Sequence, residues 1–139
     1  MIFLPLFNTS WFRLAALLVG GSIFLWLRLE DDNVIAAAIG GLLITCLIVI
    51  GWTWRKTGGR EYTWRWLLAA YTALGGLIGL GTAVSAALLM LIKNGLHAHV
   101  FPEFPFGMIS GMLALAPIWA LGGALIGLGI GAVWIVWKA

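Results

Sequence analysis

Two histidines and a glutamate lie close together between residues 93 and 107, and they are the side chains of this chain best suited to chemistry. The imidazoles of His97 and His99 could ligate a metal, a haem iron or a chlorophyll magnesium, with Glu103 as a third ligand or proton acceptor. Histidines two apart point the same way on a strand but diverge by about 200° on a helix, so their spacing defines no coordination geometry. We therefore favour the alternative, an interfacial loop whose histidines are solvated or cap the preceding helix and bind no cofactor.

The same segment contains three phenylalanines that alternate with Pro102 and Pro105. Proline restricts the backbone, so this stretch is expected to be stiff as well as apolar. Free exposure of so many aromatic side chains is unusual for a protein surface. The segment is therefore predicted to lie along the membrane surface or to contact a partner protein. The residues of this partner-docking loop are Phe101, Glu103, Phe104 and Phe106.

Motifs typical of enzymes are absent from the rest of the sequence. It contains no nucleophile elbow, no Cys-x-x-Cys and no glycine-rich phosphate loop that follows a strand. None of the five acidic residues lies inside an apolar run, so a proton relay or ion path within the membrane is disfavoured. The single cysteine, Cys46, can form no intrachain disulfide. We predict no enzymatic activity and no metal site.

Long uncharged runs determine the expected fold. Three of them contain no Asp, Glu, Lys, Arg or His: residues 34–54, 66–92 and 108–137. Each exceeds the roughly 20 residues that a helix needs to cross a ~30 Å hydrocarbon core. A fourth run is bracketed by Arg13 and Arg28, whose long side chains can reach the headgroups. The sequence predicts one all-α domain over residues 1–139, a four-transmembrane-helix bundle with spans at about 12–29, 34–54, 66–92 and 108–137.

Composition supports a membrane protein independently. The chain is 63% hydrophobic and only 9% charged, with a mean hydropathy of +1.07, values that an ordinary soluble domain does not have. Its net charge of +3 comes from basic residues beside the apolar runs, which is typical of membrane orientation and not of nucleic-acid binding. The expected surroundings are therefore a lipid bilayer, and no nucleic acid is expected as a partner.

The basic residues are divided unevenly between the two expected faces. One face holds Arg13, Arg55, Lys56, Arg60, Arg65 and Lys138, and the other holds Arg28 and Lys93. By the positive-inside rule, both termini are predicted to be cytoplasmic or on the equivalent stromal side. Seven of the nine tryptophans lie near the same basic face, where indoles settle at headgroup level. This bias excludes a dual-topology antiparallel dimer, because such proteins need a charge difference close to zero.

Small residues recur at every fourth position of the last two spans. These predicted helix-packing residues are Gly75, Gly79 and Ala83, and Gly123, Gly127 and Gly131. Residues four apart share one face, so a second backbone can approach along each set, within the chain or in a partner. Each span also contains a glycine doublet near the expected bilayer middle: Gly20-Gly21, Gly40-Gly41, Gly75-Gly76 and Gly122-Gly123. The doublets could form a tight waist, or leave room for a lipid tail, quinone or pigment ring.

Two short stretches resemble segments of uncharacterised four-span membrane proteins from cyanobacteria. They are Lys93-Asn-Gly-Leu-His-Ala-His-Val-Phe-Pro-Glu-Phe104 and Ala116-Pro-Ile-Trp-Ala-Leu121. The resemblance implies a plasma or thylakoid membrane location and an association with photosynthetic or respiratory complexes. It implies no activity and no functional residue.

The abundance of packing positions and aromatic residues, against the scarcity of reactive groups, predicts a non-enzymatic integral membrane protein. We expect an accessory subunit, scaffold or assembly factor of a larger membrane complex. The alternative is a small passive channel or carrier formed by a parallel homo-oligomer.

Overall fold

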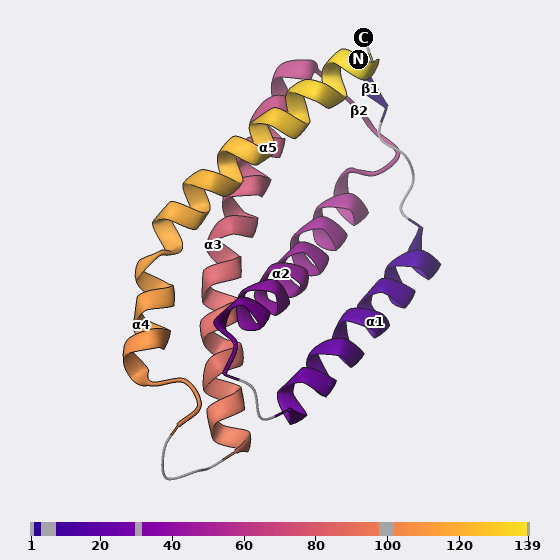
Figure 1. Ribbon diagram of the computed structural model, residues 1–139. Helices are drawn as coiled ribbons and strands as arrows, with labels where there is room; N and C mark the ends of the chain where they lie inside the picture. Colours follow the sequence, from indigo (N-terminus) through magenta and orange to yellow (C-terminus); the bar gives the residue numbers. More distant parts are fainter. Residues whose placement is uncertain (1, 4–7, 30–31, 98–101, 139) are drawn as a thin grey trace.

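The computed structural model describes residues 2–3, 8–29, 32–97 and 102–138, and they form an all-helical fold (Figure 1). Its helices are α1 (Thr9–Arg28), α2 (Val34–Thr57), α3 (Trp64–Leu96), α4 (Phe106–Ala114) and α5 (Ala116–Lys138). Four of them, α1, α2, α3 and α5, are long and apolar enough to cross a membrane. This confirms the expected all-α class, and the four long apolar helices support the expected membrane protein.

The last predicted span, residues 108–137, consists of two helices and not one. The two helices meet at a kink at Leu115, whose backbone angles stay in the right-handed helical region and whose N–H still donates to the Gly111 carbonyl. Pro117 explains the interruption, because it has no N–H to donate to the carbonyl of Leu113 and its ring crowds that group. α4 is only 9 residues long, so the membrane-length part of this region is α5.

A two-stranded antiparallel pair joins the start of the chain to the α2–α3 connection, a feature that the sequence did not indicate. β1 (Ile2–Phe3) pairs with β2 (Glu61–Tyr62) in the register Ile2↔Tyr62 and Phe3↔Glu61. Two residues are too few to show an alternating hydrophobic pattern. Before β2 the chain turns at Gly59, whose φ of 77° favours glycine.

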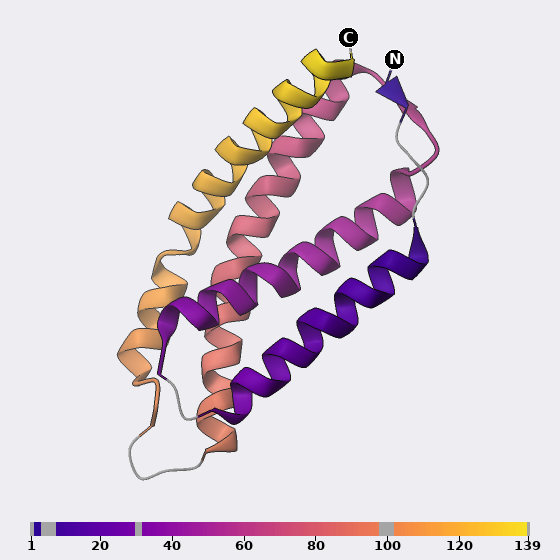
Figure 2. The same ribbon diagram turned by 45° about the vertical axis from the view of Figure 1, so that its right-hand side comes forward.

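The longest helix, α3, packs against α5 on one side and against α2 on the other (Figures 1 and 2). α5 runs beside it in the opposite direction, and four glycines lie at the contact: Gly75 and Gly79 of α3, and Gly123 and Gly127 of α5. A methyl group at Gly75 would overlap the Gly123 carbonyl, and one at Gly79 would overlap the Trp119 carbonyl. Only glycine permits this backbone approach, so these four glycines form one intramolecular interface.

On its other side α3 is crossed by α2. A Cβ at Gly41 would lie 2.7 Å from the backbone oxygen of Thr82 and 2.7 Å from the nitrogen of Ala86, so the two backbones also meet closely here. The Thr45 hydroxyl donates to the Gly41 carbonyl at 2.8 Å and lies 3.1 Å from the hydroxyl of Ser85. These hydroxyls are therefore satisfied within the helix pair, as intramembrane Ser and Thr side chains usually are.

The outermost helix is α1, which contains no buried residue. Asparagine side chains begin both α1 and α2: Asn8 accepts from the amides of Ser10 and Trp11, and Asn33 caps α2 in the same way. The ring of Phe12 lies directly against Gly51 of α2. α1 is thus attached to the rest of the protein mainly through α2 and through the polar site described next.

Candidate functional site

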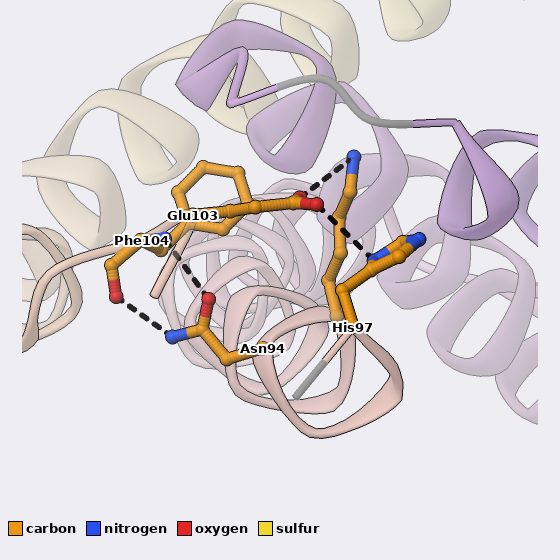
Figure 3. A network of polar contacts seen from close by, with 5 residues as sticks. Asn94, His97, Glu103 and Phe104 are labelled. Atoms are coloured by element: carbon orange, nitrogen blue, oxygen red, sulfur yellow. Dashed lines mark hydrogen bonds and ion pairs between the residues drawn. The ribbon is translucent and has the colours of Figure 1, made fainter. Parts of the chain in front are cut away.

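A group of polar side chains lies at the C-terminal end of α3, the end opposite the β1–β2 pair (Figure 1). α3 provides Lys93, Asn94 and the capping residue His97, and the segment that leads into α4 provides Glu103 and Phe104. We call these five residues the Glu103 cluster. Lys93 and His97 are four positions apart, so they share one face of the helical end. One oxygen of the Glu103 carboxylate faces His97 (Figure 3), and the other faces Lys93.

Glu103 contacts two side chains of α3 and its cap. Its Oε2 is 3.5 Å from Nζ of Lys93, and its Oε1 is 3.2 Å from Nδ1 of His97. The Lys93 side chain is completely buried, and that of Glu103 is only 12% exposed. A buried ammonium is costly unless a group of opposite charge accompanies it, and Glu103 supplies that charge.

Aromatic rings complete the surroundings of Lys93. Its Nζ lies 4.2 Å from the ring centroid of Trp26 in α1 and 6.0 Å from that of Phe104. The negative face of an aromatic ring attracts a cation, most strongly for tryptophan. The rings of Trp26 and Phe104 are themselves in tilted contact, with centroids 6.5 Å apart. The buried lysine thus connects α1, α3 and the connection before α4.

Asn94 binds the backbone of Phe104 with both ends of its amide. Its Nδ2 donates to the Phe104 carbonyl at 2.7 Å, and its Oδ1 accepts from the Phe104 amide at 2.9 Å (Figure 3). This pairing fixes one residue of the connection against α3. The Phe104 ring is fully buried in the core cluster with Met90, Ile109 and Met112.

Changing Asn94 to aspartate should loosen this connection specifically. The carboxylate still accepts from the Phe104 amide but faces the Phe104 carbonyl without a proton to donate. The loss of a part-buried hydrogen bond, with two acceptors left opposed, costs about 1–3 kcal/mol. We expect a lower melting temperature and faster hydrogen exchange at the amide of Phe104. Ser110→Ala is the control, because that exposed hydroxyl bonds only within its own turn to Gly107. Equal effects of the two changes would contradict a clamping role for Asn94.

The structure brings together His97 and Glu103, two of the three candidate ligands, while His99 lies outside the described residues. Among residues 2–3, 8–29, 32–97 and 102–138, no three His, Cys, Asp or Glu side chains form a group that could hold a metal ion. The Nδ1 atom of His97 faces the Glu103 carboxylate, and the same carboxylate is shared with Lys93. The polar groups of the site are thus arranged to hold the connection onto α3.

The residues of the predicted partner-docking loop have different surroundings. Phe104 is completely buried inside the protein, and the largely buried Glu103 is paired with Lys93, so neither is presented on the surface. Phe106, the first residue of α4, is 80% exposed. Phe101 lies outside the described residues. Of the described members of the loop, Phe106 is the one available to a partner.

Sequence reasoning did not identify Lys93 or Asn94 as part of a site. The expected third span ended at residue 92, whereas α3 continues to Leu96. Those additional helical residues bring Lys93 and His97 onto one face. The sequence does contain a signal for this contact. Lys93 and His97 are four positions apart, and Glu103 is the only acidic residue between residues 93 and 107.

The chain matches no protein-family model, no curated protein and no solved structure.

Proposed function

We propose that this protein is a non-enzymatic integral membrane protein that acts as an accessory subunit, scaffold or assembly factor of a larger membrane complex. The observation that carries the proposal is the exposed ring of Phe106, which follows directly after a firmly held segment. Asn94 fixes the backbone of Phe104, and Lys93 and His97 hold Glu103. An aromatic side chain on a pre-ordered segment loses little conformational entropy on binding, which favours its use as an interface anchor.

A passive channel or carrier remains the competing hypothesis. The contact between α3 and α5 disfavours a path between these two helices, because a methyl group at Gly75, Gly79, Gly123 or Gly127 would already overlap backbone atoms of the other helix. The competing hypothesis places the channel between copies of the chain, which this contact does not affect. The proposed complex instead contains other proteins, and a native gel distinguishes the two cases.

Phe106→Ser should release the protein from its complex. The complex is extracted in mild detergent and run on a native gel, and the co-migrating proteins are identified by mass spectrometry. Truncation of a central aromatic anchor typically costs 2 kcal/mol or more of binding, about thirtyfold in affinity. The variant should therefore move to the position of the free protein, with its melting temperature unchanged.

Val136→Ser is the matched control, because Val136 is 78% exposed and lies near the far end of α5. That variant should stay with the complex. An assembly containing only this chain would favour the homo-oligomeric channel. A coloured cofactor or stoichiometric metal that is lost on changing His97 and His99 to alanine would favour the cofactor hypothesis.

The proposed orientation places both termini on the cytoplasmic or stromal side of a plasma or thylakoid membrane. In support, the start of α1, the end of α2, the start of α3 and the end of α5 lie at one end of the molecule (Figure 2). That end contains Arg13, Arg55, Lys56, Arg60 and Arg65. A positively charged face of this kind is retained in the cytoplasm. The resemblance to cyanobacterial proteins supports the choice of membrane.

Single cysteines test this orientation in a Cys46→Ser background. Gly58→Cys lies at the end of α2 and should react with a membrane-impermeant maleimide only from the cytoplasmic side. Asp32→Cys lies in the exposed α1–α2 connection at the other end and should react only from the opposite side. Reaction of either cysteine from both sides would show mixed insertion and would contradict the proposed topology.

A further inference from the structure

An apolar groove runs between α1 and α2. The two helices meet at Phe12 with Gly51 and approach again where Ile23 is near Gly40. A first cavity along this helix pair starts beside Asn8, passes Phe12 and has a volume of about 350 Å³. Its walls include Trp11, Ala15 and Val19 of α1 and Leu43, Leu47 and Trp54 of α2.

A second cavity of about 390 Å³ adjoins the first and shares Phe12, Val19 and Leu47 with it. Gly20 lines this second cavity, and a Cβ placed at Gly20 or Gly21 would meet no atom within 4 Å. Here glycine does not bring two backbones together, in contrast to Gly75 and Gly79 of α3. Instead it leaves space beside the α1 backbone, and an apolar occupant would regain the contacts that an open groove lacks.

The length of the groove corresponds to one leaflet of a bilayer. From Phe12, which lies beside the Arg55 guanidinium, to Ile23, the two cavities follow 11 residues of α1, about 16 Å at 1.5 Å per residue. Half of a ~30 Å hydrocarbon core is about 15 Å. A lipid acyl chain from a single leaflet therefore has the length and the chemistry to fill it.

The charges at one end of the groove specify which lipid fits. The Arg55 guanidinium lies 5.5 Å from the centroid of the Phe12 ring, which lines the groove, and Lys56 is the next residue of α2. Arg13 follows Phe12 in α1. Glu61 is the one acidic residue that the described part of the chain has at this end. A headgroup at this entrance therefore meets a net positive charge, and guanidinium groups bind phosphate particularly well.

We propose that the α1–α2 groove is a binding site for an anionic glycerophospholipid of the basic-side leaflet. One acyl chain lies between Ala15, Val19 and Leu47, and the phosphate contacts Arg55 and Arg13. The lipid fills the space that α1 leaves open and so attaches this helix, which has no buried residue of its own, to the bundle. This site lies at the opposite end of the molecule from the Glu103 cluster and does not depend on the proposed function.

Native mass spectrometry of the delipidated protein tests the site. The protein is mixed with equal amounts of phosphatidylglycerol and phosphatidylcholine that carry the same acyl chains. We expect one retained phosphatidylglycerol, preferred over phosphatidylcholine. Arg55→Gln should reduce this preference about fivefold, the effect of one basic residue near an anionic lipid. Arg60→Gln removes the same charge from the nearby exposed connection and should change nothing.

Filling the groove tests its apolar part. Ala15→Trp should abolish retention of both lipids, whereas Ala132→Trp, on an exposed position of α5, should retain them. Because Ala15→Trp could disturb folding, a photoreactive phosphatidylglycerol with a diazirine midway along one chain provides a measurement on the unaltered protein. The crosslinks should fall in residues 15–19 and 43–50.

Three results would overturn the proposal. One is equal retention of the two lipids by the unaltered protein, and another is crosslinks that fall mainly on α5. The third is occupation of the groove by a second copy of the chain, revealed by a dimer that Ala15→Trp dissociates.

Discussion

Replacing Gly79 with leucine is expected to lower the free energy of unfolding by about 3 kcal/mol or more, the upper part of the range for overpacked cores. The reason is the α3–α5 contact. Even a Cβ at this position would overlap the carbonyl of Trp119 and would lie 3.1 Å from the Cα of Ala120. Both obstacles are backbone atoms, which cannot rotate away as a side chain does. The two helices would have to separate along their whole contact, and the loss should appear as a lower melting temperature and lower accumulation in the membrane.

Gly122→Leu is the matched control, because it makes the same chemical change on the partner helix. A Cβ at Gly122 meets no atom within 4 Å. Leucine also has the better helix propensity, by up to about 1 kcal/mol. This variant should therefore be as stable as the unaltered protein or slightly more stable. Similar losses at Gly79 and Gly122 would mean that the α3–α5 interface does not depend on close backbone approach.

The glycines of α3 and α5 also illustrate what the sequence could and could not predict. The spacing of Gly75 and Gly79 identified a face suited to close approach. It could not identify the partner helix or the register, because each glycine stripe is compatible with any other. The doublets were less informative still: Gly41 and Gly75 lie at helix contacts, whereas Gly20, Gly21 and Gly122 face open space. Composition alone does not distinguish a glycine that permits contact from one that leaves a gap.

The candidate site was predictable only in part. The sequence indicated the segment that contains His97 and Glu103, since both residue types can carry chemistry. It could not indicate the burial of Lys93, because a lysine at the end of an apolar run ordinarily extends to the headgroups. Its position depends on the ring of Trp26, which comes from a distant part of the chain. The burial of Phe104 was not predictable for the same reason, because it requires the core formed by α2, α3 and α4.

The second large effect is expected at the ion pair of Lys93 and Glu103. Glu103→Leu removes the carboxylate that lies 3.5 Å from the buried ammonium. Breaking a buried ion pair on one side typically costs about 3–5 kcal/mol, because the remaining charge has lost its compensation. The contact of Lys93 with the Trp26 ring persists and offsets part of this cost. We therefore expect a loss near the lower limit, about 3 kcal/mol, measured as a decrease in unfolding free energy in detergent.

A double-mutant cycle shows whether this loss comes from the uncompensated charge. Lys93→Met keeps an unbranched side chain of similar length, so in combination with Glu103→Leu it replaces the ion pair by apolar contacts. Such replacements are often neutral or stabilising, and the double variant should be more stable than Glu103→Leu alone. Lys93→Met combined with Ser110→Ala is the control, because the exposed hydroxyl of Ser110 bonds only to Gly107 and the effects should add within about 0.5 kcal/mol. Additive losses for Lys93 and Glu103 would mean that the two charges are not coupled, and that the Glu103 cluster holds the α3–α4 connection through Asn94 and Phe104 alone.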